Sequence, residues 1–144
     1  MELTELSVIE TIDAMVSSGM RDAGYRHVNL DAGWAARHRD QDGELAADLV
    51  RFPRGLAPLT SYTYSEGLLF GIYSSPFNET CGQGLQIASM GHEARDAATF
   101  ASWGVDYVKC DWCRNDADHA EQVRVFTAMG DALRDTGRRG AHVT

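Results

Sequence analysis

Helical and extended patterns alternate along the whole of this 144-residue chain. Strand-like stretches begin near residues 25, 68, 105 and 141. Around them, apolar residues recur at helical spacing over four segments, which are Ser7–Met20, Gly55–Glu66, His92–Trp103 and Asp116–Thr136. Alternation of this kind indicates βαβ units, whose strands run parallel in one sheet. The predicted fold class is therefore α/β.

Two α/β architectures fit this pattern, an open doubly wound sheet and a (β/α)₈ barrel. An open nucleotide-binding sheet needs a glycine-rich turn after a strand, and the chain has neither a G-x-G-x-x-G nor a P-loop sequence. Polar side chains at the ends of the first three strand patterns favour the barrel, because barrel enzymes place their chemistry there. A complete barrel takes about 250 residues, so we expect a partial barrel that begins on a helix.

The ends of the helices carry their own signals. Ser7 and Glu10 have the spacing of a capping box, which predicts the start of the first helix. Asp116 is the predicted N-cap of the last helix and Gly137 its stop. Apolar spacing predicts two buried faces: Val8, Ile9, Ile12, Met15 and Val16 in the first helix, and Val123, Phe126, Met129 and Leu133 in the last.

The third strand pattern ends in two charged residues, Lys109 and Asp111. Side chains alternate along a strand, so Lys109 and Asp111 share one face, with Cys113 beside them if the strand continues, while Cys110 points to the other. A lysine and an aspartate are costly to bury without partners. At the carboxyl end of a parallel strand such a pair indicates chemistry, and the alternative is a structural ion pair.

Two long loops follow the first two strands. The first, from Ala32 to Arg54, holds Trp34 and Phe52, and the second, from Ser75 to Gly91, holds Cys81. Long loops in compact domains are functional or disordered. The aromatic residues make disorder the weaker interpretation for the first loop.

Composition excludes several partners. The net charge of -8 argues against nucleic acid and anionic membranes, since both bind basic patches. No apolar run approaches the roughly 20 residues of a membrane span. The first residues, Met1 to Glu5, are acidic and unlike a signal peptide. Either the protein is cytoplasmic or its native N-terminus is missing, so a secreted location stays open, as does the oligomeric state.

No metal or cofactor site is predicted. The five histidines form no i, i+4 pair and no cluster, which argues against zinc. Cys110-x-x-Cys113 has the spacing of a redox or zinc pair. Strand alternation, however, directs the two thiols to opposite faces.

Many short motifs occur in the order typical of one enzyme family. They are Asp22-Ala23-Gly24-Tyr25, Asn29-Leu30-Asp31, Trp34, Arg39-Asp40, Arg51-Phe52-Pro53, Phe70-Gly71-Ile72-Tyr73-Ser74-Ser75, Thr80-Cys81, Trp103-Gly104-Val105-Asp106 and Lys109-Cys110-Asp111-Trp112-Cys113. On these residues the chain resembles glycoside hydrolase family 27, the α-galactosidase or melibiase family, with a Ser-Ser typical of its bacterial branch. The resemblance implies that residues 1–144 are part of one (β/α)₈ catalytic domain, about its strands 2 to 4.

The resemblance also implies an activity, retaining hydrolysis of terminal α-linked galactose from oligosaccharides or glycoconjugates. Asp111 falls on the family's nucleophile, Lys109 on a lysine that contacts the sugar, and Asp31 on an aspartate that grips galactose hydroxyls. Trp34 and Tyr73 match pocket residues. Retaining hydrolysis needs two carboxyl groups about 5–5.5 Å apart, and a nearby Lys109 ammonium would favour an ionised nucleophile.

The resemblance pairs two of the three cysteines. It implies a disulfide between Cys81 and Cys113 beside the substrate pocket, with Cys110 left as a free thiol against the helices. Reduced cysteines are the alternative in a cytoplasmic protein. No cofactor is implied, and the expected ligand is an oligosaccharide or other glycoside.

The chain departs from the family at two points. A second galactose-binding aspartate would stand at Ala32, so the exact sugar stays open. The family's acid/base aspartate lies on a later strand and has no match here, so we expect this chain alone to be inactive. Three alternatives follow: a sibling specificity (β-L-arabinopyranosidase, α-N-acetylgalactosaminidase or isomaltodextranase), a non-catalytic carbohydrate-binding relic, and a structural domain whose charges merely pair.

Overall fold

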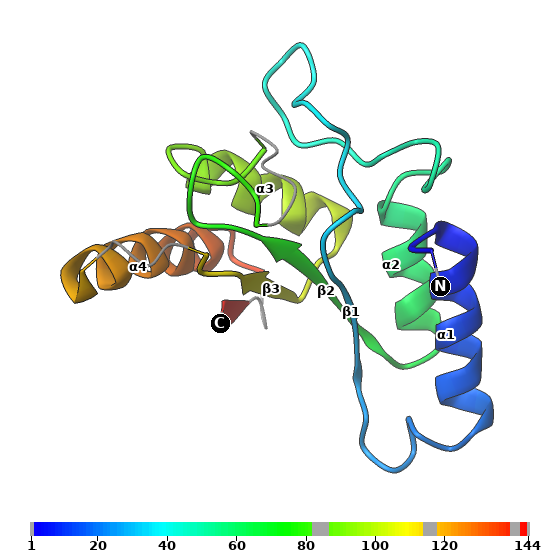
Figure 1. Cartoon of the computed structure of the whole chain (residues 1–144). Helices are drawn as coiled ribbons and strands as arrows, with labels where there is room; N and C mark the ends of the chain where they lie inside the picture. Colours follow the sequence, from blue (N-terminus) through cyan, green and yellow to red (C-terminus); the bar gives the residue numbers. More distant parts are fainter. Residues whose placement is uncertain (1, 82–86, 114–117, 139–141, 144) are drawn as a thin grey trace.

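Four helices and four strands alternate in the part of the chain that the structure describes (Figure 1). This computed structural model describes residues 2–81, 87–113, 118–138 and 142–143. The elements are α1 (Glu5–Ser17), β1 (His27–Leu30), α2 (Ala57–Ser65), β2 (Leu69–Ser74), α3 (Glu93–Trp103), β3 (Tyr107–Cys110), α4 (His119–Asp135) and β4 (His142–Val143). The predicted order of elements is confirmed.

The strands form one parallel sheet in the order β1-β2-β3-β4. Each helix from α2 to α4 contacts the helix before it, as expected when right-handed crossovers follow sequential strands and put all helices on one face. The strand order of a doubly wound sheet reverses at its switch point, and no reversal occurs among these four strands. The winding is therefore that of a partial (β/α)₈ barrel.

Only one face of the sheet is fully covered. Val28 and Leu30 are buried in β1 whereas His27 and Asn29 are exposed, the alternation that the sequence predicts. The covered face packs against the helices in a core whose largest fully buried side chains include Phe52, Phe70, Phe100, Ile12, Leu56, Leu59, Leu68, Ile72 and Met129. The opposite face carries the polar side chains of the strand ends.

The start of α1 differs from the prediction. The capping box is formed by Thr4 and Ser7, not by Ser7 and Glu10. The Ser7 N–H donates to the Thr4 hydroxyl at 3.2 Å, and the Thr4 N–H donates to the Ser7 hydroxyl at 3.0 Å. The helix begins three residues earlier because Thr4 caps it and because the Glu5 N–H donates to the Arg51 carbonyl at 2.8 Å. It also ends earlier, at Ser17 rather than Met20.

The last helix, α4, differs from the prediction in its cap and its face. Asp118 is the N-cap, and its side chain accepts the Glu121 N–H; the predicted cap, Asp116, lies outside the described residues. Val123 is 52% exposed, so its predicted burial is wrong. The buried side chains are Val125, Met129 and Leu133, which share one face because they are spaced four residues apart.

The long loop from Ala32 to Arg54 is ordered. Trp34 and Phe52 are buried, and an antiparallel bridge joins Ala35 to Ala47. The interpretation that this loop is not disordered is confirmed. Among the helices of the described residues, none is both long enough and apolar enough to cross a membrane.

Candidate active site

The carboxyl ends of β1, β2 and β3 bring polar side chains from three parts of the sequence together. Tyr73 in β2 pairs in register with Lys109 in β3, and Leu30 in β1 pairs with Ile72. Asp31, directly after β1, therefore lies beside Tyr73, and Tyr73 lies beside Lys109, on the face that the helices do not cover. The N–H of Asp111 donates to the Ser74 carbonyl at 3.0 Å, which extends the ladder past β3.

Lys109 lies between two carboxylates. Its Nζ is 2.8 Å from Asp31 Oδ2 and 3.8 Å from Asp111 Oδ2, and it also lies over the Tyr73 ring, 5.6 Å from the centroid. The prediction that Lys109 and Asp111 share one face of the strand is confirmed. The shorter contact is nevertheless with Asp31, 78 residues away along the chain.

These contacts shift two pKa values. The hydrogen bond from Lys109 and the one from the Ala32 N–H, at 2.7 Å, hold the pKa of Asp31 below its usual range. The hydrogen bond to Asp31 in turn raises the pKa of Lys109. At neutral pH the cluster therefore contains an ionised Asp31 and an ammonium. Its side chains are 39% to 67% exposed, so water screens the attraction and a ligand can reach them.

Tyr73 is held by hydrogen bonds at both its hydroxyl and its backbone carbonyl. Its hydroxyl accepts the Cys81 N–H at 2.9 Å, and its carbonyl accepts the Trp34 indole N–H at 2.9 Å. Tyr73 is 3% exposed, and burial raises its pKa, so the phenol is neutral at physiological pH. Trp34 is equally buried and packs edge to face on Phe100 and Trp103. This predicted pocket residue is therefore also part of the core.

A disulfide joins Cys81 to Cys113, as the resemblance implied, with 5.7 Å between the two Cα atoms. Cys110 is a free, buried thiol, and burial raises its pKa to about 12. The disulfide ties the residue two positions after Asp111 to the residue that binds the Tyr73 hydroxyl. Cys81, Asp111 and Cys113 form the one metal-ligand-like group among the described residues, but sulfurs in a disulfide are not thiolate ligands.

A small cavity adjoins this cluster. It is lined by Ala32, Trp34, Ala35, Tyr73, Ser74, Thr80 and Ile87, and its volume is about 20 Å³, room for one water molecule or one methyl group. Sequence reasoning missed Ala35, Ser74, Thr80 and Ile87 as lining residues. Ser74 and Thr80 lie within motifs that carry the family resemblance, whereas the signal for Ala35 and Ile87 was their position in the two long loops that follow β1 and β2.

Successive β/α units that carry a carboxylate–ammonium–carboxylate cluster at their strand ends define part of a (β/α)₈-barrel enzyme. A family profile described as alpha galactosidase A matches residues 3–143. The chain belongs to the α-galactosidase family, glycoside hydrolase family 27, and the resemblance noted in the sequence is confirmed.

Individual relatives show the same likeness. The α-galactosidase of Cyamopsis tetragonoloba is 43% identical over 137 residues, which are 95% of this chain and 33% of that protein. Alpha-galactosidase A of Cellvibrio japonicus is 44% identical over 126 residues, 88% of this chain and 30% of that protein. The crystal structure of α-galactosidase I from Mortierella vinacea superposes with a TM-score of 0.89 at 40% identity, over 94% of this chain and 34% of that one. The chain thus spans about a third of the length of its relatives.

Proposed function

We propose that this chain supplies the nucleophile and part of the sugar-binding wall of a retaining α-galactosidase. Asp111 is the nucleophile, Lys109 and Asp31 bind hydroxyl groups of the sugar, and Tyr73 and Trp34 shape the pocket. The substrate is a terminal α-galactoside of an oligosaccharide or glycoconjugate. Membership of the α-galactosidase family supports the reaction type, and the geometry of the cluster supports the roles of the residues.

The observation that carries this proposal is the position of Lys109 between Asp31 and Asp111. The Lys109 ammonium is a hydrogen-bond donor, and the Asp31 carboxylate beside it is an acceptor. A sugar hydroxyl placed between them can accept from one and donate to the other. The Asp111 carboxylate, which is 41% exposed, remains accessible for attack.

The reaction proceeds in two displacements. An Asp111 carboxylate oxygen attacks the anomeric carbon while the bond from that carbon to the glycosidic oxygen breaks, and the leaving oxygen takes a proton from a carboxylic acid. Water then attacks the anomeric carbon, gives its proton to the same carboxylate and releases Asp111. The resemblance assigns that acid to a later strand of the barrel, so the 144-residue chain by itself should not hydrolyse galactosides.

A chimera tests the role of Asp111. Residues 3–143 replace the matching segment of the Mortierella vinacea enzyme, and hydrolysis of p-nitrophenyl α-D-galactoside is measured with and without Asp111→Asn. The amide cannot form the glycosyl-enzyme, so kcat should fall at least about a thousandfold. Incubation with a slow 2-deoxy-2-fluoro-galactosyl substrate should add one sugar mass to the peptide that contains Asp111.

The matched control is Asp22→Asn, because Asp22 is exposed and pairs only with the neighbouring Arg21 among the contacts described. This variant should keep the activity of the chimera. Retention of most activity by Asp111→Asn, or a sugar label on a different carboxylate, would remove Asp111 from the role. If the chimera does not fold, D-galactose binding to the 144-residue chain, and its loss in Lys109→Met, tests the sugar-binding part.

A further inference from the structure

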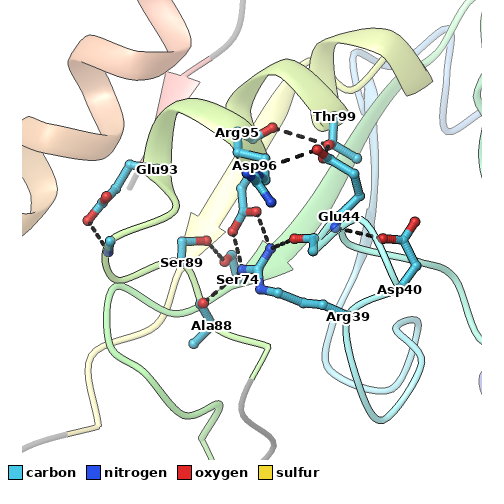
Figure 2. A network of polar contacts seen from close by, with 12 residues as sticks. Arg39, Asp40, Glu44, Ser74, Ala88, Ser89, Glu93, Arg95, Asp96 and Thr99 are labelled. Atoms are coloured by element: carbon cyan, nitrogen blue, oxygen red, sulfur yellow. Dashed lines mark hydrogen bonds and ion pairs between the residues drawn. The ribbon is translucent and has the colours of Figure 1, made fainter.

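The Arg39 side chain joins the two loops that wall the cavity (Figure 2). Its guanidinium donates to both oxygens of Asp96 in α3, at 2.6 and 2.8 Å. It also donates to the Ala88 carbonyl at 3.0 Å and to the Gly43 carbonyl at 3.3 Å. Arg39 thus binds its own loop, the loop after β2 and a helix at the same time.

Burial makes this contact different from a surface ion pair. The Asp96 side chain is fully buried and that of Arg39 is 11% exposed. A paired, bidentate contact of this kind fixes orientation as well as charge. Removing either partner leaves a buried charge without compensation, so the arrangement resists displacement.

The Ala88 carbonyl is the point at which Arg39 bonds to the loop after β2. Ile87, the preceding residue, lines the cavity. Ser89 and Met90, the two residues after Ala88, are hydrogen-bonded to the segment that follows β2: the Ser89 N–H donates to the Ser75 carbonyl and the Met90 N–H to the Phe77 carbonyl, both at 2.9 Å. The Ser89 and Ser74 hydroxyls are 2.7 Å apart. Arg39 therefore holds the outer side of a strip whose inner side contacts the cavity.

The opposite wall belongs to the loop that contains Arg39. Ala32, Trp34 and Ala35 line the cavity from that loop. We propose that Arg39 is a positioning residue that fixes the Ile87 wall of this cavity relative to the Trp34 wall, and thereby sets the affinity of the adjoining Asp31–Lys109–Asp111 cluster for a sugar. The link between the two is Tyr73, which lines the cavity and lies beneath the Lys109 ammonium. The effect on sugar binding rests on the proposed function, whereas the positioning of the strip does not.

A second arginine offers a matched control. Arg95, which lies in α3 beside Asp96, donates to the Asp42 carbonyl at 2.8 Å and lies 3.6 Å from Glu44, with a side chain that is 45% exposed. It ties the first loop to α3 as Arg39 does, and the contacts described give it no bond to the loop after β2. A purely structural role in docking the first loop is therefore common to both arginines, and the bond to Ala88 distinguishes Arg39.

The first experiment compares Arg39→Lys with Arg95→Gln by amide hydrogen exchange on the 144-residue chain. Lysine keeps the charge beside Asp96 but lacks the fork that reaches Ala88 as well. Exchange of the Ser89 and Met90 amides should become about tenfold faster in Arg39→Lys. The Asp106 amide, which is bonded to the Phe70 carbonyl at 2.8 Å, should change much less. Arg95→Gln should leave all three amides near their original rates.

Equal acceleration of all three amides in Arg39→Lys would show a general loss of stability and overturn the positioning role. Unchanged rates at Ser89 and Met90 would overturn it as well. If Arg39→Lys does not fold, Asp96→Asn is used in its place. Asparagine has nearly the size of aspartate but lacks its charge, so this variant weakens the contact that holds Arg39. The same selective acceleration is expected there, to a smaller extent.

The second experiment measures the dissociation constant for D-galactose in the same variants. It should rise about fivefold or more in Arg39→Lys, since a strip that moves no longer presents a fixed wall, and stay unchanged in Arg95→Gln. Faster exchange of the Ser89 and Met90 amides in Arg39→Lys, with an unchanged dissociation constant for D-galactose, would overturn the effect of Arg39 on sugar binding. If the unsubstituted chain binds no galactose, the proposed function fails for this chain and the link to the sugar fails with it, while the exchange rates still decide the positioning role.

Discussion

Lys109 shows how the environment of one residue is set by distant parts of the chain. The alternation of β3 puts Lys109 and Asp111 on one face, and this could be predicted because a strand has a period of two. The nearer partner, Asp31, could not be found from local spacing, since it depends on the pairing of β1 with β2 and of β2 with β3. Arg39 and Asp96, 57 residues apart, are a second case.

We predict that Lys109→Met raises the pKa of Asp31 toward its ordinary value of about 3.9, because the largest cause of its lowering is the hydrogen bond from Lys109. A depressed carboxyl pKa stabilises the fold above the unfolded pKa, and this stability is lost as pH falls through the folded value. Asp31 is 67% exposed, so the energy at stake is below about 1 kcal/mol.

The measurement is a carbon-13 titration of the Asp31 carboxyl from pH 2 to 6, in the chain with and without Lys109→Met. Lys109→Arg is the control that keeps the charge, and it should keep the Asp31 pKa low. An Asp31 pKa that is the same in Lys109→Met and in the unsubstituted chain would show that the backbone N–H of Ala32 alone lowers it.

The helices differ from the strands in how well their limits could be predicted. The apolar spacing locates α1 and α4, but the cap depends on which of several hydroxyl or carboxylate side chains meets a free N–H. The sequence predicted a cap at Ser7, whereas the observed cap is Thr4, and a hydrogen bond from the Glu5 N–H to the Arg51 carbonyl, 46 positions along the chain, accompanies it. The apolar spacing predicted Met129 and Leu133 on the buried face of α4 correctly. The burial of Val125 in place of Val123 accompanies the packing of α4 on α3, which the local pattern does not specify.

We predict that Thr4→Ala lowers the free energy of unfolding by about 1 kcal/mol, the usual cost of losing an N-cap. Glu10→Ala, which would remove the capping box expected from the sequence, should change it by less than about 0.5 kcal/mol because Glu10 is an exposed residue inside the helix. Urea denaturation of the two variants measures both values. A larger loss of unfolding free energy in Glu10→Ala than in Thr4→Ala would place the start of α1 at Ser7.

At the scale of the whole molecule, the disulfide closes a long segment of chain. Cys81 and Cys113 are 32 positions apart, and a crosslink over such a distance stabilises by roughly 3–4 kcal/mol in the chain-entropy model. We predict that dithiothreitol lowers the free energy of unfolding by about this amount. The effect should persist in Cys110→Ala, since that thiol is free, and vanish in Cys81→Ser. Denaturation curves that do not depend on reductant would contradict this account.

The sheet leaves an edge unpaired at β1, which has β2 as its one partner among the described strands. A free edge presents backbone N–H and C=O groups in a row and is a template for strand pairing with a second copy. We therefore predict that the 144-residue chain associates at micromolar concentration, measured as a concentration-dependent sedimentation coefficient.

His27→Lys, which adds a charge to the exposed side of β1, should weaken association because charged edge strands resist pairing. His38→Lys adds the same charge in an exposed loop position and should have little effect. A monomer with a sharp, reversible unfolding transition at these concentrations would contradict the prediction, and equal effects of the two lysines would assign the association to net charge instead of the β1 edge.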